Sequence, residues 1–152
     1  MIAWCEEVDS AIVSFTTMAG LAGDPISEAD FEVEYLPAPH RPPTRLPAGK
    51  MAVYGFWSNG TWLKIGKAGP NSKARYTSQH YNAGSAQSTL AGSLASDPRM
   101  LSVDGFNPQA VGNWIKAETH RFNILLSAGR RRELLALLEA FLHLRLRPRY
   151  EG

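Results

Sequence analysis

Cysteine is nearly absent from this 152-residue chain. Cys5 is the only one, so the chain can form no internal disulfide and no cysteine cluster for zinc. We therefore expect a reducing, cytoplasmic compartment, and oxygen ligands for any bound metal. No run approaches the roughly 20 apolar residues that span a bilayer, and the apolar stretch 11–23 follows acidic rather than basic residues, unlike a signal peptide. These absences predict a soluble protein that is neither exported nor membrane-bound.

The chain is about one domain long, with 44% hydrophobic and 20% charged residues, as in folded globular proteins. Its net charge of +2 hides an asymmetry. Residues 1–48 carry eight acids and two bases, a net −6, and residues 49–152 carry six acids and fourteen bases, a net +8. A basic body of this kind suits a polyanion such as nucleic acid, although an ordinary solvated surface explains the charge equally well.

Proline marks the expected domain boundary. Residues 37–47 contain five of the ten prolines and should be extended. We therefore expect an acidic N-terminal extension and proline-rich linker in residues 1–48, followed by a folded domain in residues 49–152. Within the extension, the pattern indicates a helix over about the first 20 residues, a helix start at Ser27 and then a short strand.

The second part of the chain predicts a small α+β fold. Two strands flank the Asn59-Gly60 pair, a strong hairpin signal, and a third, buried strand is expected over 121–126. The sequence predicts helices over 71–81, with Asn71 or Ser72 as cap, and over 84–96, 108–119 and 132–146. Together they predict a three-stranded, mainly antiparallel sheet flanked by helices, with a helical insertion between the second and third strands.

Glu139 lies beside the apolar stripe of the final predicted helix. None of the residues three or four positions away is a lysine or arginine that could pair with it along the helix. The carboxylate therefore either has a function elsewhere in the fold or points to water.

Five short motifs occur in the same order as in the GIY-YIG nuclease superfamily, which the chain resembles over most of residues 51–150. The resemblance is strongest to the amino-terminal incision domain of the bacterial nucleotide-excision repair nuclease. The motifs are Val53-Tyr54, KIGKA at 64–68, Arg75 on the next helix, Leu138-Glu139-Ala140 and Pro148-Arg149-Tyr150. The resemblance implies an endonuclease that hydrolyses DNA phosphodiester bonds with a single Mg²⁺ or Mn²⁺ ion.

The resemblance also implies roles for individual residues. Glu139 falls on the family's metal-binding glutamate, a ligand type that suits Mg²⁺. Tyr54 falls on its first catalytic tyrosine, whose pKa we expect nearby cations and metal to lower so that it helps to activate water. Lys64, Lys67 and Arg75 would then bind the scissile phosphate.

Further basic residues are candidates at lower priority. His80 and His143 are auxiliary candidates, although a helix-surface histidine and an edge-of-core histidine are the simpler interpretations. Lys73 and the run Arg130, Arg131 and Arg132 are expected nucleic-acid contacts, the run because cations are disfavoured where a helix begins.

Two positions depart from the family pattern. Lys64 stands where the family has its second tyrosine, and Glu151 stands where it has an asparagine. An inactive nucleic-acid-binding module and a protein-interaction domain therefore remain alternatives. Specificity is expected to come from residues 82–119, from a homodimer or from a partner protein. A further hypothesis is that the acidic segment folds over the basic body and mimics DNA.

Overall fold

The Asn59-Gly60 pair forms the hairpin turn that the sequence predicts. Both residues have positive φ, 48° and 78°, as a tight two-residue hairpin turn requires. The turn joins β2 (Lys50–Ser58) to β3 (Thr61–Ala68), which pair antiparallel. The hairpin is thus confirmed in the computed structural model, which describes residues 3–150.

The sheet has four strands, not the three that the sequence predicts. β4 (His120–Ser127) pairs antiparallel with β2, and β1 (Glu32–Leu36) pairs antiparallel with β4. The strand order is β1-β4-β2-β3. The acidic β1 was expected in an extension, but its alternating pattern lets it pair at the free edge of β4 while Glu32 and Glu34 stay exposed. The α+β class is confirmed and the strand number is corrected.

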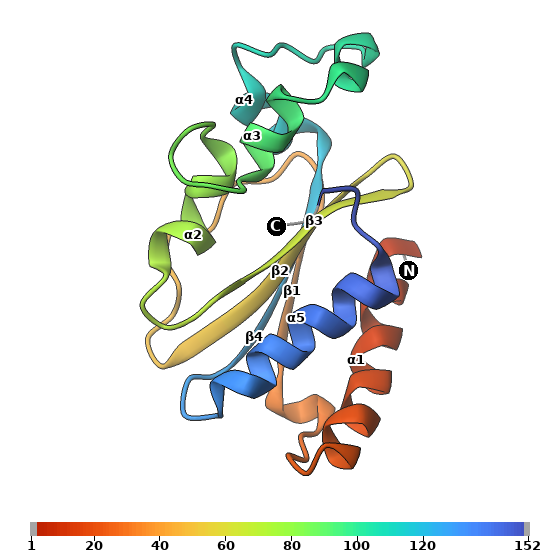
Figure 1. The fold of residues 1–152 in the computed structure, drawn as a ribbon, viewed down its shortest axis with the longest axis vertical. Helices are drawn as coiled ribbons and strands as arrows, with labels where there is room; N and C mark the ends of the chain where they lie inside the picture. Colours follow the sequence, from red (N-terminus) through yellow and green to blue (C-terminus); the bar gives the residue numbers. More distant parts are fainter. Residues whose placement is uncertain (1–2, 151–152) are drawn as a thin grey trace.

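Two long helices cover one face of the sheet. They are α1 (Ala3–Leu21) and α5 (Arg132–Leu146), which lie side by side in Figure 1. Apolar residues of both helices pack on β2, β3 and β4 in one buried cluster, which includes Trp4, Val8, Ile12, Phe15, Met51, Val53, Ile65, Phe122, Ile124, Leu138 and Leu142. At roughly 1.5–3 kcal/mol for each fully buried large apolar side chain, this cluster is a major source of stability.

The acidic segment is consequently part of the fold and not an appendage. Its helix α1 fills one side of the core, and its strand β1 extends the sheet. The boundary expected after residue 48 does not divide two packing units in residues 3–150. In α1 the acids Glu6, Glu7 and Asp9 are exposed, while apolar residues recur at helical spacing and are buried.

Short helices cover the opposite face and gather toward one end of the sheet (Figure 1). They pack around a second buried cluster that contains Tyr54, Phe56, Tyr76 and Tyr81. The elements are α2 (Lys73–Thr77), η2 (Gln79–Tyr81), α3 (Leu90–Ala95), η3 (Pro98–Ser102) and α4 (Val111–Glu118). The helical insertion predicted between the second hairpin strand and β4 is therefore present.

The end of the chain covers half of the exposed edge of β3. After α5, Arg147 adopts a left-handed conformation with φ 53°, and the next residues turn back to the sheet. The N–H groups of Arg149 and Tyr150 donate to the carbonyls of Trp62 and Leu63, both at 2.9 Å. The edge of the second half of β3 stays uncovered in the described structure and lies between α2 and α5.

In the described part of the chain, no helix has the length and apolar character needed to cross a membrane.

Candidate functional site

A cleft of about 820 Å³ lies along the second half of β3. It is bounded by the edge strand itself, by the start of α2 and by the middle of α5. Five of the residues that the sequence singles out line it: Lys64, Lys67, Arg75, Glu139 and His143. The fold therefore brings three separate elements and most of the predicted phosphate and metal ligands to one place.

Strand register explains how both lysines reach the cleft. Lys64 pairs with Phe56, so its side chain projects from the face that carries α2. Lys67 pairs with Val53 and projects from the opposite face, toward α5. Because β3 is the edge strand of the sheet, the two side chains approach the cleft from its two sides.

The Lys64 ammonium has no hydrogen-bond partner among the described residues. The residue is only 1% exposed, and its Nζ atom is buried. Burial lowers the pKa of Lys64, and the positive charge of Arg75 lowers it further. An unpaired buried ammonium is strongly unfavourable, so an acceptor in the cleft, preferably an anion, would stabilise the charged form of this side chain.

Glu139 has a cationic partner, supplied by the strand and not by its own helix. Lys67 Nζ donates to Glu139 Oε1 at 2.9 Å, with the two side chains 46% and 23% exposed. Glu139 is the one carboxylate among the residues that line the cleft. Within residues 3–150 no group of three His, Cys, Asp or Glu residues could hold a metal. The site fits a hydrated Mg²⁺ that takes one protein carboxylate and otherwise water and phosphate oxygens.

Arg75 holds the loop that precedes α3. Its guanidinium donates to the carbonyl oxygens of Gln87, at 3.0 Å, and Ser88, at 3.2 Å. The side chain is half-buried and still lines the cleft. Two of its five N–H donors are therefore used internally, and the others can serve a ligand. Lys73, two residues earlier, is exposed and lies outside the cleft lining.

Tyr54 does not have the lowered pKa that the sequence analysis expects. The residue is fully buried behind the cleft, and burial raises the pKa of its phenol to about 12, against the opposing charges of Arg121 and Arg75. The expectation took account of the cations but not of the burial. A Cβ placed on Gly66 would lie 2.9 Å from Tyr54 Oη, so the phenol sits directly under the glycine of the KIG motif.

His80 is buried, so its interpretation as a helix-surface residue is wrong. It lies in the short helix η2 with 0% exposure. Its Nε2 is 2.7 Å from Tyr54 Oη, and its Nδ1 accepts from the Leu90 N–H at 3.0 Å. Burial, reinforced by the charge of Arg75, lowers the pKa of His80 to about 2, so the ring is neutral.

His143 lies half-buried at the side of the cleft, one helical turn beyond Glu139. Its Nε2 is 3.0 Å from the Ile65 carbonyl oxygen. A carbonyl only accepts, so Nε2 is the donor and fastens α5 to the edge strand.

The three arginines predicted to bind nucleic acid all have partners within the chain. Each lies near the start of α5 and outside the cleft lining. The pairs are Arg130 with the Pro25 carbonyl at 2.7 Å and with Asp24 at 3.5 Å, Arg131 with Glu133 at 3.0 Å, and Arg132 with the Ala128 carbonyl at 3.2 Å. These contacts explain cations at a helix start without a nucleic-acid partner.

Arg121 is a residue that the sequence reasoning missed. It is fully buried on β4, and its guanidinium carbon lies 4.7 Å from the centre of the Tyr54 ring and 5.0 Å from that of Tyr76. Its nitrogens donate to the Asn123 side chain at 2.8 Å, the Tyr81 hydroxyl at 3.1 Å and the Tyr76 carbonyl at 2.8 Å. No carboxylate in the described structure pairs with it.

A signal for this network was present in the sequence. Arg121 and Asn123 alternate with apolar residues in β4, so both project from the same face of the sheet. Two polar side chains on one face of a buried strand indicate a buried polar network. The positive charge of Arg121, close to the Tyr54 ring, adds to the positive field beneath the cleft.

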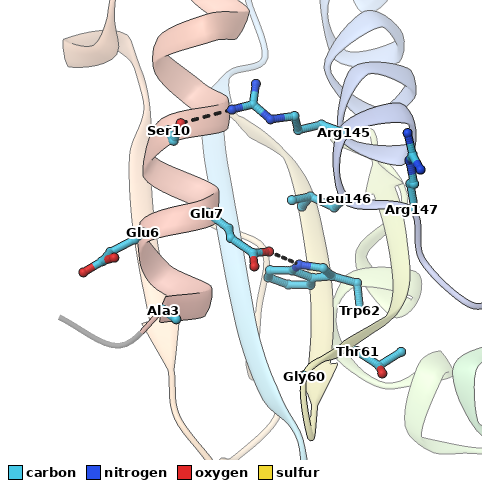
Figure 2. Close-up of a pocket in the computed structure, with 10 residues that line it drawn as sticks. All are labelled: Ala3, Glu6, Glu7, Ser10, Gly60, Thr61, Trp62, Arg145, Leu146 and Arg147. Atoms are coloured by element: carbon cyan, nitrogen blue, oxygen red, sulfur yellow. Dashed lines mark hydrogen bonds between the residues drawn. The ribbon is translucent and has the colours of Figure 1, made fainter.

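The acidic residues of the N-terminal segment do not cover this cleft. Glu7 accepts a hydrogen bond from Trp62 Nε1 at 2.6 Å, in a second pocket of about 750 Å³ between α1, the hairpin turn and the end of α5 (Figure 2). Glu32 pairs with Lys50 at 2.8 Å. None of the acids in residues 1–48 lines the cleft, so an acidic cover that mimics DNA is not found at this site.

The Pro148-Arg149-Tyr150 motif lies at the end of the described residues. Tyr150 donates through its hydroxyl to Asp97 at 2.6 Å, whereas Glu151 lies outside the described residues.

Comparisons with models of protein families, with curated proteins and with solved structures gave no match to this chain.

Proposed function

We propose that this protein is a divalent-metal-dependent endonuclease that cleaves DNA phosphodiester bonds in the cleft along β3. The observation that carries the proposal is the buried Lys64 ammonium, which has no partner in the described structure and lines the same cleft as Arg75. A phosphodiester supplies the acceptor that this ammonium lacks, and the planar guanidinium suits its two free oxygens.

Each cleft residue has a defined task in this proposal. Lys64 and Arg75 bind the non-bridging oxygens and stabilise the charge that develops on them. Glu139 would hold Mg²⁺ or Mn²⁺, which when bound stabilises the leaving oxygen of an in-line displacement. Lys67, which pairs with Glu139 at 2.9 Å, would be free to bind a phosphate oxygen if Glu139 held the metal.

The Lys67–Glu139 ion pair also favours a second candidate function. A carboxylate already neutralised by a lysine, with no three-residue metal cluster elsewhere in residues 3–150, suits a module that binds nucleic acid without cutting it. The two candidates differ in one property, because only the nuclease requires a metal at Glu139.

The proposal also includes the source of DNA specificity and the cellular compartment. DNA specificity would come from the helical insertion 82–119, from a homodimer or from a partner protein. A reducing, cytoplasmic compartment fits the single cysteine, which is buried and free.

Nicking of supercoiled plasmid with Mg²⁺, Mn²⁺ or EDTA tests the nuclease. Glu139→Gln and Arg75→Ala should each reduce metal-dependent nicking by about a hundredfold or more. Glu133→Gln is the matched control, because Glu133 lies on the same helix and is also paired with a cation, but is exposed outside the cleft. DNA binding without nicking by the wild type in any metal would select the binding module, and an equal loss of nicking in the Glu133 control would refute the assignment of Glu139.

A further inference from the structure

The protonation of the His80 ring is fixed by a backbone group. The Leu90 N–H lies 3.0 Å from Nδ1, and a backbone N–H can only donate. Nδ1 therefore carries the lone pair. The ring is neutral, since burial and nearby positive charges lower the pKa of His80 to about 2. Its single proton must then be on Nε2.

This tautomer determines the direction of the next hydrogen bond. His80 Nε2 and Tyr54 Oη are 2.7 Å apart, and the protonated Nε2 is the donor. The phenol oxygen accepts that bond and so cannot give its own hydrogen to His80. No other group in residues 3–150 forms a hydrogen bond with the Tyr54 hydroxyl. The hydroxyl hydrogen is a buried donor without an acceptor, an unfavourable arrangement unless a ligand supplies one.

A second buried donor lies on the same face of the same two strands. Tyr54 pairs with Gly66 across β2 and β3, and the neighbouring pair on that face is Phe56 with Lys64. The glycine has no side chain to cover the phenol, and both Gly66 and Lys64 line the cleft. Two unsatisfied donors beneath one cleft point to one acceptor.

We infer that Tyr54 acts as a neutral hydrogen-bond donor to a phosphate oxygen bound in the cleft, and that His80 is a positioning residue that directs the hydroxyl hydrogen toward it. The inference rests on the proposed function for the identity of the anion. It excludes Tyr54 as the base that activates water through His80, because the only lone pair of the neutral ring is occupied by the Leu90 N–H. Proton removal from water must then be carried out by another group.

The same arrangement predicts that the hydrogen bond from Tyr54 to phosphate depends little on pH near neutrality. The phenol has a pKa of about 12 and the imidazole one of about 2, so neither titrates in that range. The titratable and charged groups that act on this pair come from several elements: Lys64 on β3, Arg75 and Tyr76 on α2, Tyr81 on η2, Arg121 on β4 and Glu139 on α5.

Nitrogen-15 NMR of the histidine rings tests the tautomer directly, without activity. The His80 signals, assigned by their loss in His80→Gln, should show a proton on Nε2 and none on Nδ1 from about pH 5 to pH 9. A proton on Nδ1, or titration of the ring within that range, would overturn the inference.

Binding of a fluorescent DNA duplex in EDTA tests the donor role separately from catalysis. Tyr54→Phe should weaken binding by about tenfold, as expected for a hydrogen bond to a charged acceptor. Tyr76→Phe is the matched control, since its ring lies in the same cluster but its hydroxyl faces Glu34. Unchanged affinity of the Tyr54 variant would refute the inference and leave the proposed function intact, whereas failure of the wild type to bind DNA would refute both.

Discussion

Replacement of Lys64 by methionine should make the protein more stable and less able to bind DNA. Methionine has a similar length and an unbranched, adaptable side chain, so it fills the space of a residue that is only 1% exposed. The substitution removes the ammonium that has no partner in the described structure. A residue that is unfavourable for folding is expected where a function needs it.

The size of the effect has an upper limit. At an ordinary pKa of 10.5, release of the lysine proton at pH 7 costs roughly 5 kcal/mol, since each pH unit is worth about 1.4 kcal/mol. The folded protein can always bury the neutral amine instead, so the part of the Lys64 penalty that comes from its charge cannot exceed this cost. We expect Lys64→Met to raise the free energy of unfolding by about 1–4 kcal/mol.

The sign of the pH dependence follows from the lowered pKa of Lys64. Between the folded and unfolded pKa values the unfolded chain binds more protons, so the wild type gains stability as pH rises through that window. The penalty is full below the folded pKa and disappears near pH 10.5. The stability difference between Lys64→Met and wild type should therefore be larger at neutral pH than near pH 10.5 and should narrow as pH increases.

Urea unfolding across this pH range measures the difference, and DNA binding in EDTA measures the functional loss. Lys116→Met serves as the control, because Lys116 is exposed on α4 and should show neither effect. A variant less stable than wild type at pH 7, or a difference that does not change with pH, would mean that the Lys64 ammonium is paired or hydrated in solution.

Three further predictions concern the groups beneath the cleft. Gly66→Ala places a Cβ 2.9 Å from Tyr54 Oη and should lower the free energy of unfolding in urea by about 1–3 kcal/mol. Gly69→Ala is the control and should lower it less, because a Cβ there would have no atom within 4 Å. Equal losses in the two variants would contradict the close contact. Arg121→Met leaves the Asn123 and Tyr76 oxygens without their donor and the Tyr81 hydroxyl with His40 alone. It should lower the free energy of unfolding by at least about 2 kcal/mol in the same assay, and unchanged stability would show that water replaces the guanidinium. The pKa of His80 is lowered to about 2, so the stability of the folded protein should fall as pH drops below about 6.5. In acid titrations followed by circular dichroism, His80→Gln should make stability depend less steeply on pH.

Local patterns predicted the elements whose signals are strong along the chain. The Asn59-Gly60 turn and the final helix, which runs from Arg132 to Leu146, follow from short-range chemistry and apolar spacing. The acidic segment was predicted to be an extension because its charge was given more weight than the regular spacing of its apolar residues. Strand β1 and helix α1 carry acids on their exposed faces, and such a pattern belongs to an amphipathic surface element as readily as to an extension.

The buried polar groups were harder to predict because their environment is assembled from distant segments. His80 lies in a three-residue helix, too short for any periodicity to distinguish a buried from an exposed face. Its burial depends on α3, whose Leu90 N–H it accepts, and on Tyr54 of β2. The raised pKa of Tyr54 follows from the same burial. The predicted cations and metal favoured a lowered pKa for Tyr54, whereas burial in the folded protein raises it.

The lysine spacing in β3 shows how far local geometry can define the site. Residues three apart in a strand project to opposite faces, so Lys64 and Lys67 cannot meet above one face of a sheet. They can act on one ligand only where the strand is an edge and helices flank it from both sides, as α2 and α5 do here. A bound phosphodiester must then cross that edge, with Lys64 and Arg75 on one side and Lys67 with Glu139 on the other. Loss of DNA binding in both Lys64→Met and Lys67→Met would show that both sides contribute, whereas loss in one alone would place the ligand on a single face.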